Sequence, residues 1–226
     1  MVINWINVLK GIGIILVVLG HLLVKDYPYV KPYIYMVHMP LFFIISGYLF
    51  KPDSNFRSYF IKKFFAFGIP YLSFLFILFF IPSIFLEVRN VQLTFKSFLN
   101  VILHAGIGGR YLGGFATVFW FITVLFTTQQ IMNFIFNKFN KKIILIIVAG
   151  CLILAYLNSV FFPKFWLPLN MNVVAMSLPI FFIGYKFKAY ENSPFLVHIS
   201  ILLSILGSLL IAFGIDKFFY MKLGFY

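Results

Sequence analysis

Apolar segments of about 20 residues recur along this chain, and a segment of that length crosses the hydrocarbon core of a membrane as one helix. Such segments lie near 8–25, 33–50, 64–86, 117–136, 143–162, 172–188 and 195–213. Lipid offers no hydrogen bonds to an open backbone, so segments of this kind must form helices that pack together. The sequence therefore predicts an all-α fold, a polytopic transmembrane helix bundle with about seven spans.

The composition excludes most other classes of protein. Of 226 residues, 63% are hydrophobic and 10% are charged, whereas a soluble domain carries roughly 25% charged residues. The net charge of +13 is also found in nucleic-acid-binding proteins. Here, however, the basic residues form short clusters between apolar segments, where membrane proteins keep the charges that set their orientation. We expect contact with membrane lipid and none with nucleic acid.

The positions of the Lys and Arg residues predict the orientation. With a cytoplasmic N-terminus, the inner segments hold ten of the eighteen: Lys10, Lys51, Arg57, Lys62, Lys63, Lys138, Lys141, Lys142, Lys186 and Lys188. These inner charges lie in the shorter loops, which is the form of the bias that determines topology. We therefore expect the N-terminus on the cytoplasmic side.

Acidic residues argue against ion-coupled transport. The five present are Asp26, Asp53, Glu87, Glu191 and Asp216, and all lie at the edges of spans or in loops. A coupled transporter usually needs a carboxylate in the middle of the membrane. Transport stays open as a minor alternative, because polar residues line the first two spans. The sequence contains no His, Cys or acid spacing typical of a metal site, so we expect no metal.

Lys10 and His21 stand at the two ends of an uncharged apolar run. Eleven helical steps return to within roughly 20° of the starting direction and rise roughly 16 Å. A helix that begins at the membrane surface near Lys10 would place His21 on the same face, about half a bilayer deep. An ionisable side chain at that depth is a candidate for function. A structural histidine bonded to a neighbouring carbonyl is the alternative.

The second span contains the run 38–48, which reads His-Met-Pro-Leu-Phe-Phe-Ile-Ile-Ser-Gly-Tyr. His38 is either an interfacial anchor or part of a site. Pro40 suits the first turn of a helix, where its missing N–H costs nothing. Ser46 and Gly47 offer a small surface for close helix approach, and packing is the favoured interpretation of this pair.

Arg110 lies in the glycine-rich segment 106–114. Glycines let a backbone approach a ligand closely, and a guanidinium offers a fork to phosphate or carboxylate. No strand-then-helix context supports a dinucleotide fingerprint. A turn outside the membrane is the favoured interpretation, with an anion contact as the alternative.

Four motifs in this order resemble the acyltransferase 3 family of membrane acyltransferases. They are Lys10 followed by ten residues and His21, the run 38–48, the run 69–71 (Ile-Pro-Tyr) and the run 120–126, which begins with Trp-Phe-Ile. The resemblance covers residues 5–190, and the most similar branch contains fucose 4-O-acetylases and other exopolysaccharide O-acetyltransferases.

This resemblance implies an acetyl-CoA-dependent O-acyltransferase of a bacterial plasma membrane, with no bound cofactor. Its acceptor would be a hydroxyl of a cell-surface glycan, an exopolysaccharide or a lipid-linked sugar precursor. His21 would act as base or transient acyl carrier, and Lys10 would meet the phosphates of CoA at the cytoplasmic mouth. His38, Ser46 and Arg110 would bind donor or acceptor.

Two departures from the family pattern support an alternative function. Family members usually carry an aspartate where this chain has Asn7. They also have about ten spans, whereas about seven are predicted here. We therefore expect residues 1–226 to be a single integral-membrane acyltransferase 3 domain that lacks its C-terminal spans. The alternative is a non-catalytic remnant, or an accessory membrane subunit of a glycan-modifying system.

Overall fold

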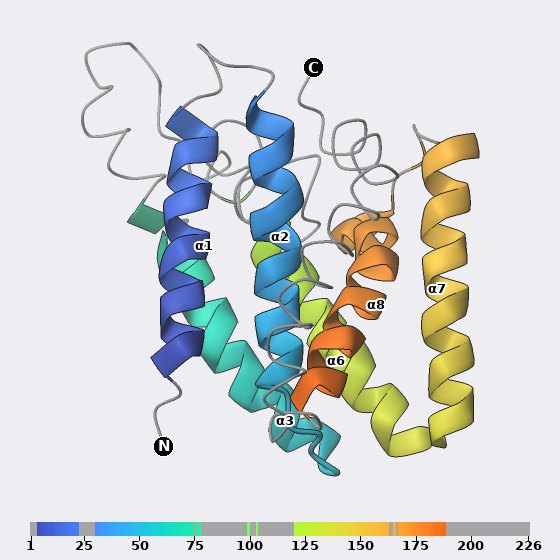
Figure 1. Cartoon of the computed structure of the whole chain (residues 1–226). Coiled ribbons are helices and arrows are strands. Elements are labelled where there is room, and N and C mark those ends of the chain that lie inside the picture. The colour runs from blue at the N-terminus through green and yellow to red at the C-terminus, as the bar shows by residue number, and fades with distance from the viewer. Residues whose placement is uncertain are drawn as a thin grey trace. The chain divides into compact units, whose positions relative to one another are not determined.

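The structure is a computed structural model that describes residues 4–22, 30–74, 76–77, 99, 103, 120–162, 165 and 167–188. Every regular element within these ranges is helical (Figure 1), which confirms the prediction of an all-α fold for this part of the chain. The longer helices are α1 (Asn4–Leu22), α2 (Val30–Tyr48), α3 (Phe56–Lys63), α6 (Trp120–Lys138), α7 (Lys141–Phe161) and α8 (Met171–Phe187). A π-helical turn, η1 (Phe64–Gly68), follows α3, and a 3-10 turn, η5 (Pro168–Asn170), precedes α8.

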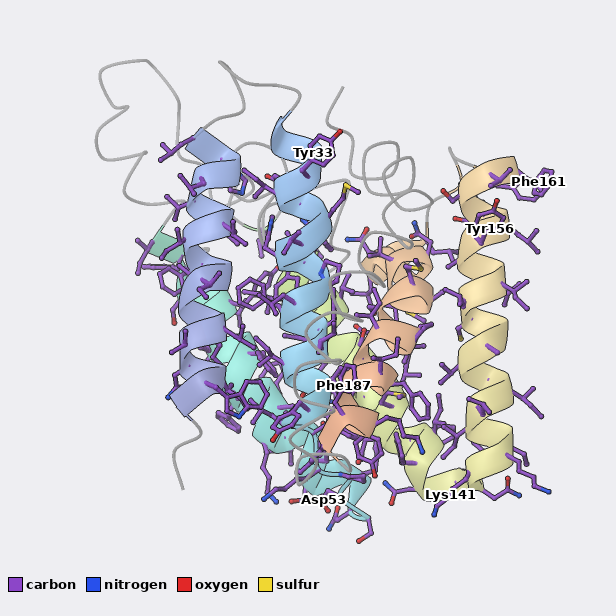
Figure 2. The ribbon with its side chains drawn as sticks, in the orientation of Figure 1. Tyr33, Asp53, Lys141, Tyr156, Phe161 and Phe187 are labelled. Atoms are coloured by element: carbon purple, nitrogen blue, oxygen red, sulfur yellow. The ribbon has the colours of Figure 1, made fainter. Side chains whose placement is uncertain are left out.

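Three of the described helices are long and apolar enough to cross a membrane, over Trp5–Leu22, Lys141–Phe161 and Pro168–Phe187. Tyr33–Tyr48 forms a shorter apolar helix. On α7, Tyr156 and Phe161 are 60% and 66% exposed and point away from the helix (Figure 2), as side chains in contact with lipid would. Of the seven predicted spans, 195–213 and much of 64–86 lie outside the described residues.

The chain divides into two compact units. Unit 1 comprises Met1–Lys51, Leu145–Lys164 and Ala175–Tyr226, and unit 2 comprises Pro52–Ile144 and Phe165–Val174. Unit 1 therefore holds α1, α2 and most of α7 and α8. Unit 2 holds α3, η1, α6 and η5.

In unit 1, α1 and α2 lie side by side (Figure 1), and glycines of α1 face α2. A Cβ atom added to Gly13 would lie 2.8 Å from the ring of Phe42, and one added to Gly20 would lie 3.0 Å from the ring of Tyr35. The two glycines are seven residues apart and so occupy one face of α1. Small residues at such positions let membrane helices approach closely where no hydrophobic force draws them together.

Unit 1 also contains a close crossing of α2 with α8. A Cβ atom on Gly47 would collide with the backbone carbonyl of Phe181, and one on Gly184 would collide with the carbonyl of Ile44. The contact is therefore backbone against backbone. This geometry agrees with the packing interpretation of Gly47.

In unit 2, the carboxamides of two asparagines, one of them buried, attach a short loop to α6. Asn133 is fully buried; its Oδ1 accepts the backbone N–H of Asp53 at 2.8 Å, and its Nδ2 donates to the backbone carbonyl of Asp53 at 3.1 Å. Asn137 donates to the same carbonyl at 2.8 Å. The loop then leads into α3, which Asn55 caps by accepting the N–H of Ser58 at 3.0 Å. These bonds fix the start of α3 against α6.

Candidate active site

Lys10 and His21 lie on one regular helix, so the predicted register between them holds. Helix α1 begins at Asn4, six residues before Lys10, and Trp5 and Ile6 extend its apolar run. His21 stands about 26 Å along the axis from Asn4, in the last turn of the part of this helix that the structure describes. The depth of His21 in the membrane stays a prediction. Lys10 is half-buried, and His21 is exposed.

A tyrosine connects the two histidines of unit 1. The hydroxyl of Tyr35 lies 3.4 Å from Nε2 of His21, with the ring centroids 6.0 Å apart. On its other side, the Tyr35 ring makes an edge contact with His38 at 4.9 Å between centroids. We call His21, Tyr35 and His38 the histidine–tyrosine cluster. It joins residues from α1 and α2 in one place.

The imidazole of His38 has a defined tautomer. The side chain is 0% exposed, and its Nδ1 lies 2.7 Å from the carbonyl oxygen of Ile34, one turn earlier on α2. A carbonyl can only accept a hydrogen bond, so Nδ1 carries the proton. The neutral ring then has a lone pair on Nε2. Among the residues that the structure describes, none bonds to this buried atom.

Pro40 is ten residues inside α2 and not in its first turn, which corrects the prediction for this proline. The helix begins at Val30 because residues 30–37 continue the helical run beyond the start of the predicted span. A proline has no N–H, so the carbonyl of Met36 receives no bond from position 40. The helix is thus weakened within one turn of His38.

The remaining predicted residues do not join the cluster. Ser46 is half-buried and lies about 12 Å further along α2 than His38, beside the crossing with α8. Arg110 lies outside the described residues. The structure thus brings His21 and His38 together through Tyr35 and leaves Ser46 apart from them.

Sequence reasoning missed Tyr35 and the polar row of α6. Tyr35 and His38 are three residues apart and so share a face of α2, a spacing visible in the sequence. On α6, Thr128, Gln129 and Asn133 are buried within a segment predicted only as an apolar span. Gln130 is buried as well, and no described residue bonds its amide.

Two titrating groups outside the spans stabilise unit 2. The backbone N–H of Asn55 and the ammonium of Lys62 hold the pKa of Asp53 below its usual value, and Lys62 lies 3.3 Å from that carboxylate. Burial raises the pKa of Tyr59, so its phenol stays protonated and donates to Oε1 of Gln129 at 3.4 Å. The carboxylate of Asp53 thus joins the loop to α3, and the phenol of Tyr59 joins α3 to α6.

Comparison with known proteins gives one match. The acyltransferase 3 family model, described as "Acyltransferase domain", matches residues 3–225. No curated protein and no solved structure matches the chain. The matched range includes every described helix and all three residues of the histidine–tyrosine cluster. The chain therefore belongs to the acyltransferase 3 family of membrane O-acyltransferases.

Proposed function

We propose that this protein transfers an acetyl group from acetyl-CoA to a hydroxyl of a cell-surface or exopolysaccharide sugar. Family membership supports the acyl transfer. The resemblance to fucose 4-O-acetylases supports the acetyl donor and the sugar acceptor. The single observation that carries the assignment of a site is the histidine–tyrosine cluster on α1 and α2, because it gathers titratable groups in an otherwise apolar part of the chain.

The chemistry needs a base or a carrier. A sugar hydroxyl is a poor nucleophile at neutral pH, so a positioned group must remove its proton or first take up the acyl group in a more reactive form. His21 is the residue we assign to this step, as base or as transient acyl carrier. The Tyr35 hydroxyl, 3.4 Å from its Nε2, steadies the imidazole.

Lys10 and Arg110 are proposed contacts for anionic groups, with Lys10 on the phosphates of CoA. Lys10 lies about 16 Å before His21 along α1. The pantetheine arm of acetyl-CoA is an extended chain that could bridge this separation and carry the thioester toward His21. Ser46 is proposed to contact donor or acceptor further along α2.

The proposed topology is a multi-pass protein of a bacterial plasma membrane, with about seven spans and a cytoplasmic N-terminus. Lys10 then lies about 9 Å from the start of α1. Its long side chain can reach back to the inner surface while the stem stays in lipid. His21, in the last turn of the described helix, would face the side from which an exported glycan is reached.

The test is His21→Ala as the sole copy in the source cells. We expect O-acetyl groups on the surface polysaccharide to disappear while the amount of protein in the membrane stays normal. Val18→Ala is the matched control, since Val18 lies on the same helix and is 51% exposed. Full O-acetylation in the His21→Ala cells would contradict the assignment. Unacetylated polysaccharide in cells with the unaltered protein would instead favour the alternative of a non-catalytic remnant.

A further inference from the structure

We propose that His38 is the general base of the reaction, and that its Nε2 takes the proton of the acceptor hydroxyl. This inference rests on the proposed O-acyl transfer and refines it, because it gives the two histidines different tasks. Sequence reasoning gave His38 only a binding role.

The first support is the tautomer of His38. Because Nδ1 donates to the carbonyl of Ile34 at 2.7 Å, Nε2 has a free lone pair in the neutral ring. A general base needs this state before reaction, and a backbone carbonyl that fixes one nitrogen leaves the other for the substrate. No carboxylate is required for this arrangement.

The second support is the burial of an atom with an unused acceptor. Nε2 of His38 is enclosed and has no partner among the described residues. Leaving a buried acceptor unpaired costs free energy, and a ligand that supplies the missing donor removes that cost. Only a hydrogen-bond donor can satisfy this lone pair, and the hydroxyl of the proposed sugar acceptor is such a donor.

The third support is the aromatic neighbour. The side chain of His38 is 0% exposed, so the acceptor reaches Nε2 only if an adjacent side chain moves. Tyr35 makes the edge contact at 4.9 Å and also approaches His21. Tyr35 is thus the side chain that contacts both histidines of the proposed site.

The acceptor oxygen forms a bond to the acyl carbon while its proton passes to Nε2 of His38. The acyl group has by then passed from the thioester to the imidazole of His21, which released CoA as its thiolate. The bond from the acyl carbon to that imidazole now breaks and leaves His21 neutral. The imidazolium of His38 then returns the proton to the CoA thiolate. The products are the O-acyl sugar and free CoA. Because His38 is the base in this step, His21 keeps only the role of acyl carrier.

Two matched substitutions separate a base from a hydrogen-bond acceptor. His38→Gln keeps an amide near the position of Nε2 but cannot take a proton. His38→Asn keeps a donor for the carbonyl of Ile34 and leaves the Nε2 position empty. The purified full chain in lipid vesicles is assayed with radiolabelled acetyl-CoA and de-O-acetylated surface polysaccharide from the source cells.

We expect both variants to lose about 10²–10⁴-fold in kcat, with KM values for donor and acceptor little changed. We also expect imidazole added to His38→Ala to restore part of the rate. If His38→Gln keeps more than about a tenth of the wild-type kcat, Nε2 only positions the acceptor and the inference is wrong. If His38→Gln does not fold, the imidazole experiment decides: restored turnover supports the base, and no restoration overturns it. An inactive wild-type protein would refute the proposed function itself, which distinguishes the two failures.

Discussion

Asn133 in unit 2 and His38 in unit 1 are both 0% exposed, yet their polar atoms are used differently. The carboxamide of Asn133 bonds to both backbone groups of Asp53, at 2.8 and 3.1 Å. The imidazole of His38 bonds to one carbonyl and leaves Nε2 without a partner among the described residues. The first side chain completes the fold, and the second is equipped to meet a ligand. Burial alone therefore does not distinguish a structural side chain from a functional one. The hydrogen bonds that its polar atoms make do distinguish them.

The largest expected effect that separates the two residues comes from His38→Leu. We expect turnover to fall at least 100-fold, at about the level that loss of a general base causes. The free energy of unfolding should change by less than about 1 kcal/mol, because leucine removes the unpaired Nε2 together with the one bond of Nδ1, and the carbonyl of Ile34 keeps its bond within the helix. Acetyl transfer and detergent-induced unfolding, measured on the same preparation, check both. A loss of folding equal to the loss of activity would break the comparison.

The second prediction concerns the crossing of α2 with α8. This crossing lies near the end of α2, whereas His38 lies in its middle. Gly184→Ala should lower the free energy of unfolding by about 1–3 kcal/mol, because the added methyl group meets the backbone at Ile44. Gly11→Ala is the control, since a Cβ there has nothing within 4 Å. We expect this control to be neutral or stabilising by up to about 1 kcal/mol. Equal effects in unfolding experiments would show that the crossing is looser than described.

For Asn133→Leu we expect the opposite of the result for His38→Leu, namely lower stability with unchanged turnover. The loss of Asn133 removes the partner of the Asp53 N–H, while the Asp53 carbonyl keeps the bond from Asn137. We expect about 1–2 kcal/mol lower stability and unchanged turnover per folded molecule. Unfolding curves and specific activity at low temperature test this. Unchanged stability together with lost turnover would move Asn133 into the functional class.

The smallest effect concerns pH. The N–H of Asn55 and the ammonium of Lys62 lower the pKa of Asp53 in the folded protein, so this carboxylate stabilises unit 2 above the pKa of an unfolded aspartate. That contribution is lost as pH falls through the folded pKa. Wild type should therefore unfold later than Asp53→Asn at neutral pH, and the difference should vanish in acid. Unfolding midpoints of both proteins at the two pH values provide the measurement, and a constant difference would contradict it.

Much of this organisation could be predicted from the chain. Apolar windows located the helices that contain His21 and His38, and the 3.6-residue period gave the register of Lys10 with His21. The described part of α1 begins at Asn4, whereas the first span was predicted near 8–25, because apolar residues before Lys10 extend the helix. The depth of His21 in the membrane stays a prediction.

The hydrogen-bond partners of buried polar groups could not be predicted from the sequence. Asn133 bonds to a residue 80 positions earlier, and no local pattern encodes such a pairing. Tyr35 was missed for a different reason, because its contact with His21 depends on how α1 packs against α2. The glycines that permit this packing, Gly13 and Gly20, were visible in the sequence, but the face they meet was not.

The central claim is that α1 carries the donor contact and the reacting group, with Lys10 on CoA and His21 in the chemistry. Steady-state rates against acetyl-CoA concentration, for wild type, Lys10→Arg, Lys10→Ala and His21→Ala, test it most directly. We predict that Lys10→Ala raises the donor KM by about tenfold with kcat nearly unchanged, that Lys10→Arg keeps much of the activity, and that His21→Ala has no measurable kcat. Loss of kcat with an unchanged donor KM in Lys10→Ala, or normal turnover in His21→Ala, would contradict the account.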